Sequence, residues 1–130
     1  MPASGFAPHI QTDNGLGFVK VNYDFAKHGG ATGTITLTDI TLPTGAIVLG
    51  GGIDVLTAPL SGGSATVALQ LGSTTIKTAT AIASLTGAVA LNTLPIKTTG
   101  THPQLKVVIA TAALTAGKMD VYLYYGIPTA

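Results

Sequence analysis

A period of two in the apolar residues of Gln104–Ile127 is the feature that most limits how this chain folds. Successive side chains of a β-strand leave opposite faces of the pleat, so this period is typical of a half-buried strand. The stretch holds two such runs, whose apolar sets are Leu105, Val107 and Ile109, then Met119, Val121, Leu123, Tyr125 and Ile127. The segment Leu114–Lys118 separates them, and Gly117 can adopt a positive φ. We therefore expect a β-hairpin with its turn at Leu114–Lys118.

Six further segments have the composition of short strands bounded by Gly, Pro and Ser turns. They are Phe18–Phe25, Thr34–Asp39, Ala46–Leu56, Ala65–Leu71, Thr75–Thr78 and Leu94–Lys97. Leu94–Lys97 is expected at a sheet edge, because Pro95 cannot donate to a ladder. The segments Thr57–Ser64 and Ala79–Asn92 are expected to be loops, the second with one helical turn.

Two places indicate irregular strands. The apolar parity changes by one residue near Asp39, which predicts a β-bulge or a corner. The run Ala46–Leu56 is almost entirely apolar, which fits a strand buried on both faces or one passing between sheets. Gly50, Gly51 and Gly52 in its middle predict a bend or the close approach of another backbone. A phosphate-binding loop is disfavoured, since no Lys-Ser/Thr or helix follows the glycines.

The pattern predicts an all-β protein, an antiparallel β-sandwich of about eight strands, jelly-roll-like, with an extended N-terminal arm. At 130 residues the chain suggests one domain. We expect the arm to span residues 1–17 and the sandwich residues 18–130. The arm is either a tail without fixed structure or a segment that orders on a neighbouring subunit.

Charge is scarce in this sequence. Hydrophobic residues make up 46 % of the chain and mean hydropathy is +0.52, whereas charged residues make up only 8 %. An average soluble protein has about 25 % charged residues. A surface so poor in charge is expected to be covered largely by other subunits.

The same composition argues against several function classes. Every positive side chain is Lys and there is no Arg, so the bidentate fork and basic stripe typical of nucleic-acid binding are missing. No Cys exists to form a disulfide, a thiolate zinc site or a nucleophile. No basic segment precedes an apolar run at the N-terminus, and no apolar run reaches about 18 residues. We expect neither a secretory signal nor a membrane span.

Side chains able to perform catalysis are few and dispersed. His9, His28 and His102 have no partner at helical or strand spacing, and a zinc site would need them to converge with an Asp. Asp24, Asp39 and Asp120 fall at polar-face positions or strand ends, where solvation explains them. Asp54 alone lies in an apolar strand, facing outward or accepting a hydrogen bond. We therefore expect no enzyme activity, cofactor or metal ion.

Tyr122 and Tyr124 are expected to project from the outer face of the last strand. Tyrosine is enriched at protein interfaces, and an exposed pair can also stack on sugar rings. We favour an interface. Phe6, Pro8 and Ile10 of the arm are the other candidate interface residues.

Three stretches of the sequence resemble small structural proteins of tailed-bacteriophage virions. They are a Leu-Pro-x-Gly turn before a buried strand (Leu42–Gly45), a Gly-Ser-Ala-Thr-Val strand (Gly63–Gly72) and a closing Leu-Thr-Ala-Gly-x-x-Asp-Val-Tyr-Leu-x-Tyr run (Leu114–Tyr125). The likeness covers roughly Thr34–Ile127 and is strongest to a capsid decoration, or cement, protein. It carries no catalytic residues.

This resemblance implies a β-sandwich, often a homotrimer, that lies on junctions between subunits of the major capsid protein. We therefore expect a protein of the capsid surface of the virion, made in the host cytoplasm, that bridges capsid subunits and stabilises the shell. Another virion component, such as a tail or head-fibre base, and a carbohydrate-binding module remain as alternatives.

Overall fold

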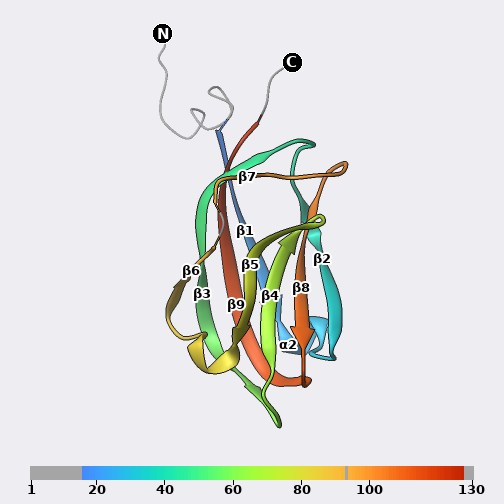
Figure 1. The fold of residues 1–130 in the computed structure, drawn as a ribbon, viewed down its shortest axis with the longest axis vertical. Coiled ribbons are helices and arrows are strands. Elements are labelled where there is room, and N and C mark those ends of the chain that lie inside the picture. Colours follow the sequence, from blue (N-terminus) through green and yellow to red (C-terminus); the bar gives the residue numbers. More distant parts are fainter. Residues whose placement is uncertain (1–15, 93, 128–130) are drawn as a thin grey trace.

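The computed structural model describes residues 16–92 and 94–127, which form two antiparallel β-sheets packed face to face (Figure 1). In the first sheet the order is β1–β9–β3–β6, and β7 also pairs with β3. Its strands are β1 (Leu16–Asp24), β9 (Leu114–Gly126), β3 (Ile47–Ser61), β6 (Ala88–Ala90) and β7 (Ile96–Lys97). The predicted β-sandwich is confirmed.

In the second sheet the order is β2–β8–β4–β5. Its strands are β2 (Gly33–Thr41), β8 (Gln104–Ala110), β4 (Thr66–Leu71) and β5 (Thr74–Ala81). Two short helical turns complete the described elements, α2 (Phe25–His28) and the 3₁₀ turn η2 (Ile82–Ser84). None of the helices in the described part of the chain is long and apolar enough to cross a membrane. The jelly-roll assignment, and the division into an arm of residues 1–17 and a domain of residues 18–130, stay predictions.

The core lies between the sheets and is built by the alternating residues that the sequence indicates. Leu105, Val107 and Ile109 of β8 are buried, as are Met119, Val121 and Leu123 of β9. Val21 and Tyr23 contribute from β1, and the strands of the second sheet add further residues: Leu37, Val67, Leu69, Leu71 and Ile76. Burial of these side chains supplies the main driving force for closing the sandwich.

The predicted hairpin of Gln104–Ile127 is wrong. Strand β8 pairs with β2 and β4, whereas β9 pairs with β1 and β3, so the two runs belong to opposite sheets. The chain crosses between the sheets at residues 111–113, where Thr111 has a φ of 74°. Leu114–Lys118, predicted as the turn, belongs to β9. Gly117 does have a positive φ, of 146°, but within the strand.

Strand β3 is longer and more irregular than expected. It extends through Ser61, into the segment predicted as a loop, and stays in the first sheet throughout. Its pairing with β9 shifts register at several points, and Leu49 and Leu56 are exposed. The prediction of a strand buried on both faces or passing between sheets is therefore wrong. The bulge predicted near Asp39 is confirmed by a register shift between Leu37 and Thr41.

Gly51 explains the run of three glycines in β3. Its φ is 152°, and a Cβ atom at this position would lie 2.0 Å from the backbone oxygen of Tyr122. Such a contact is impossible for a larger residue, so Gly51 is required where β3 and β9 approach each other. The close approach predicted from Gly50–Gly52 is confirmed.

The end of β1 also differs from expectation, because Phe25 begins α2 instead of ending the strand. The Asp24 side chain caps this turn by accepting a hydrogen bond from the Ala26 amide at 3.0 Å. The Tyr23 hydroxyl donates to the Gly29 carbonyl at 2.5 Å. Burial, and secondarily the charge of Asp24, raises the pKa of Tyr23. These contacts join β1 to the loop that leads into the second sheet.

The segment predicted as the loop Ala79–Asn92 is partly ordered into strands. Strand β5 continues to Ala81, η2 supplies one helical turn, and β6 follows. Asn92 fixes the return of the chain, since its side-chain oxygen accepts from the Thr78 amide at 2.8 Å. Strand β7 pairs with β3 alone among the described strands, which agrees with the predicted edge position of Leu94–Lys97.

Candidate interface

The outer face of the first sheet carries a cluster of aromatic side chains, two exposed and one half-buried, which we call the aromatic patch: Phe18, Tyr124 and the half-buried Tyr122. Phe18 lies opposite Tyr124 in the pairing of β1 with β9. Their ring centroids are 4.9 Å apart, and those of Phe18 and Tyr122 are 6.0 Å apart. Phe18 is 43 % exposed and Tyr124 is 54 % exposed. An apolar cluster this open is typical of a docking surface.

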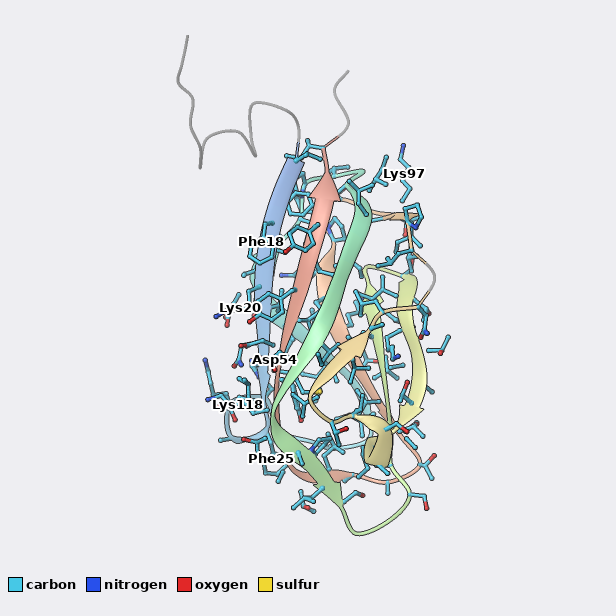
Figure 2. The ribbon with its side chains drawn as sticks, turned by 90° about the vertical axis from the view of Figure 1, so that its left-hand side faces the viewer. Phe18, Lys20, Phe25, Asp54, Lys97 and Lys118 are labelled. Atoms are coloured by element: carbon cyan, nitrogen blue, oxygen red, sulfur yellow. The ribbon has the colours of Figure 1, made fainter. Side chains whose placement is uncertain are left out.

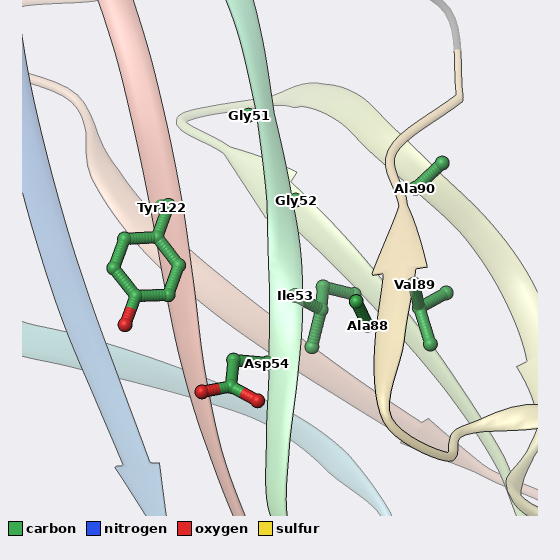
Figure 3. A pocket seen from close by; sticks show the side chains of 8 residues that line it. All are labelled: Gly51, Gly52, Ile53, Asp54, Ala88, Val89, Ala90 and Tyr122. Atoms are coloured by element: carbon green, nitrogen blue, oxygen red, sulfur yellow. The ribbon is translucent and has the colours of Figure 1, made fainter.

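Glycines leave an open groove beside this patch. Tyr122 lies opposite Gly52 of β3, and Tyr124 lies opposite Gly50. With no side chains at these positions, β3 leaves a recess bounded by Tyr122 on one side and by β6 on the other (Figure 3). Its volume is about 540 Å³. We call it the glycine groove.

Polar side chains form the next row along the strands. Asn22, Asp120 and Asp54 lie side by side on β1, β9 and β3. The Asn22 amide nitrogen donates to the Asp120 carboxylate at 2.9 Å. Asp120 is only 8 % exposed, so the expectation that solvation explains this carboxylate is wrong. Its contact with Asn22 replaces part of the lost hydration.

Lysines lie on both sides of this polar row, because Lys20 is opposite Tyr122 and Lys118 is opposite Asp24. Lys20, Lys27 and Lys118 line a second recess, together with Asp24 and the exposed Leu56, with a volume of about 350 Å³. Figure 2 shows Phe18 toward one end of the face and Lys118 toward the other. The face thus has aromatic side chains toward one end, and lysines on both sides of the row of carboxylates.

Of the predicted interface residues, the structure places Tyr122 and Tyr124 on this outer face, both beside Phe18. Phe6, Pro8 and Ile10 lie outside the described residues. The role of all five stays a prediction. Phe18 was not selected from the sequence, although it shares the parity of Lys20 and Asn22 and so belongs to their outward face. The glycine groove was also missed, since it depends on which strand lies opposite Tyr122.

The histidines that the structure describes do not converge. His28 Nδ1 accepts a hydrogen bond from the Asp24 amide at 3.0 Å and its ring stacks on Tyr23. His102 lies in a distant loop with a φ of 48°. Within residues 16–92 and 94–127, no group of three His, Asp or Glu side chains is placed to hold a metal ion.

Comparison with known proteins finds similarity in fold alone. No protein-family model and no curated protein matches the sequence. A chain of the cyanophage Pam1 capsid asymmetric unit has a TM-score of 0.64 and 22 % identity, over 98 % of this chain and 91 % of that chain. A chain of the acid-stable capsid of Helicobacter pylori bacteriophage KHP30 has a TM-score of 0.55 and 15 % identity. That match covers 88 % of this chain and 89 % of the other.

Proposed function

We propose that this chain is a bacteriophage virion structural protein that binds the assembled capsid as a decoration, or cement, protein. The observation that carries the proposal is the likeness, over nearly the full length of both chains, to a chain of a cyanophage capsid. A second phage capsid chain with similar coverage supports it. The Leu-Pro-x-Gly turn and the closing β9 sequence, which resemble virion proteins, agree with it.

The aromatic patch is the surface that we assign to docking on the major capsid protein. Exposed Phe and Tyr side chains bury a large apolar area at little cost in conformational entropy, and they are common among residues that dominate binding energy. The lysines and carboxylates at the other end of the face supply orientation, since charge complementarity contributes to register and specificity. Phe6, Pro8 and Ile10 stay predicted contacts with a neighbouring subunit, in a homotrimer.

Binding of this kind stabilises the shell by mass action. A ligand that recognises only assembled capsid subunits shifts the equilibrium toward assembly, and many copies on one particle act together. The function requires no catalytic group.

Cosedimentation with capsids tests the proposal directly. Purified protein is mixed with particles of the phage that encodes it, stripped of this chain, and the bound fraction is measured after centrifugation. We expect saturable binding and a higher temperature of shell disruption. The double variant Phe18→Ser, Tyr124→Ser should lose at least tenfold in affinity, since each exposed aromatic anchor contributes about 1 kcal/mol or more.

The matched control is Thr36→Ala, which alters an exposed residue on the other sheet. This variant should bind as the parent does. Failure of the parent protein to sediment with the particles would rule out the decoration role. Equal losses in the patch variant and in the control would remove the patch from the docking surface.

A further inference from the structure

The glycine groove has the features of a small-molecule site. It lies on the side of Tyr122 that faces away from β1. Its lining combines one aromatic ring, one carboxylate, glycine backbone and the small apolar side chains of β6: Gly51, Gly52, Ile53, Asp54, Ala88, Val89, Ala90 and Tyr122. A volume of about 540 Å³ falls within the range of natural ligand clefts. Clefts with an apolar lining and a few convergent polar groups are the usual form of such sites.

The glycines create the space in this groove. Gly52 lies between Tyr122 of β9 and Ala90 of β6 in the sheet register, so any larger residue would project into the recess. A Cβ atom on Gly52 would lie 3.3 Å from the Val89 backbone oxygen. Of the three glycines in β3, only Gly51 is required for the close approach of the β9 backbone to β3. The absence of a side chain at Gly52 therefore leaves open space without serving that approach.

Two sets of polar groups face this space without partners among the described residues. The Asp54 carboxylate makes no hydrogen bond or ion pair with any described residue. Along β3, residues 49–51 have no strand beside them on the edge away from β9, because β7 pairs only with Ile47 and Val48 and β6 only with Gly52–Asp54. No other described backbone group bonds to residues 49–51 on that edge. The backbone of Gly51, which lines the groove, therefore has no strand partner on this edge among the described residues.

We propose that the glycine groove binds a neutral saccharide. A pyranose ring has an apolar C–H face, which fits against the Tyr122 ring and the Ala88–Ala90 wall. Its hydroxyls donate to the Asp54 carboxylate, the only charged group lining the groove, and charge-assisted bonds of this kind are strong. Backbone groups of Gly51, which lines the groove, supply the remaining donors and acceptors.

The charges decide which saccharides fit. Asp54 is the only carboxylate that lines the groove, and Asp120 lies directly across from it on β9, so the electrostatic potential at this end is negative. Uronic and sialic acids would place a third carboxylate there and are disfavoured. An extended peptide is also disfavoured, because the free edge of β3 spans only residues 49–51 and is closed at both ends by β6 and β7. This site goes beyond the proposed capsid docking, with which it shares Tyr122, and its test does not depend on capsid binding.

Nuclear magnetic resonance on the ¹⁵N-labelled full chain tests the proposal. Neutral mono- and disaccharides of gluco, galacto and manno configuration are titrated to millimolar concentrations. We expect amide shifts confined to Gly50–Asp54, Ala88–Ala90 and Tyr122, with a dissociation constant on the order of 1 mM for the best ligand. Glucuronic and sialic acids should produce shifts at least tenfold weaker.

Three variants locate the contacts. Tyr122→Ala and Asp54→Asn should each weaken binding about tenfold or more, and Gly52→Ala should obstruct it. Asp39→Asn, which alters an exposed carboxylate on β2, is the matched control and should bind as the parent does. Each spectrum also reports whether the variant is folded.

Several results would overturn the saccharide site. One is the absence of shifts with every neutral sugar in the panel. Another is binding that survives both Tyr122→Ala and Asp54→Asn, or acidic sugars that bind as well as neutral ones. Shifts produced by a short extended peptide and by no sugar would reassign the groove to a peptide. None of these outcomes bears on capsid binding, which is measured separately.

Discussion

The outer faces of the two sheets differ sharply in chemistry, although both belong to one small sandwich. The first carries the aromatic patch, the glycine groove and a row of carboxylates with lysines on both sides of it. Two central rows of the second hold small or uncharged side chains and a single lysine: Thr34, Val108 and Ala68 form one row, and Thr36, Lys106 and Gln70 the next.

This contrast shows where the few charges of the chain are used. A sequence with 8 % charged residues has little polarity to distribute. The second sheet meets water mainly through threonine hydroxyls, which suit a pleated surface. The first sheet concentrates charge beside exposed aromatic rings, a combination that suits recognition more than solubility. We therefore place both proposed binding functions on the first sheet.

The largest expected effect comes from the backbone contact beneath the first face. Gly51→Ala should destabilise the fold by about 3 kcal/mol or more, because its Cβ would overlap the Tyr122 backbone oxygen and its φ of 152° is strained for alanine. Gly50→Ala is the matched control, since its Cβ would meet nothing nearer than Tyr124 Cδ2 at 4.0 Å.

Urea unfolding of both variants measures this difference. Gly50→Ala should stay within about 1 kcal/mol of the parent, with any change toward greater stability, because alanine reduces the freedom of the unfolded chain. Equal destabilisation by the two substitutions would mean that β3 and β9 do not approach most closely at Gly51.

Much of this contrast follows from the sequence, but not all of it. Alternation alone places Lys20, Asp120 and Tyr124 outward, because the side-chain period of a strand is fixed. It does not say which sheet a strand joins. A short connection such as residues 111–113 has the same sequence pattern whether it joins two strands of one sheet or crosses between sheets. The sequence therefore predicts a hairpin where the chain changes sheets.

The site depends on this missing information. Tyr122 borders a groove because Gly52 lies opposite, and Asp120 lies between Asn22 and Asp54 in the sheet. These neighbours are far apart in the sequence, and bulges in β3 displace the register that a regular strand would have. The alternation within one strand predicts which of its side chains are buried, but it does not predict which residues of other strands lie beside them.

A side-chain hydrogen bond on each face provides the next comparison. Asn22→Ala should destabilise the protein by about 1.5–3 kcal/mol, since it removes a charge-assisted bond to the largely buried Asp120. Gln104→Ala on the second sheet removes a longer, exposed contact to the Thr38 carbonyl at 3.4 Å and should cost less than about 0.5 kcal/mol. Thermal unfolding monitored by circular dichroism measures both. Similar losses would mean that the two faces are equally dependent on their polar side chains.

The smallest effect should have the opposite sign. Asp54 and Asp120 lie directly opposite on neighbouring strands, and like charges in that position are destabilising. Asp54→Asn should therefore stabilise the fold, by about 0.2–1 kcal/mol, and the gain should shrink at 1 M salt, where charges are screened over about 3 Å. Asp39→Asn, on the exposed second-sheet strand β2, should change stability by less.

The Asp54 carboxylate has no partner among the described residues, and we expect it to lower the stability of the fold. A side chain that lowers stability in this way is typical of a residue whose role is to bind a ligand. If Asp54→Asn destabilises the protein instead, the carboxylate has a structural role, and the case for the groove as a binding site weakens with it.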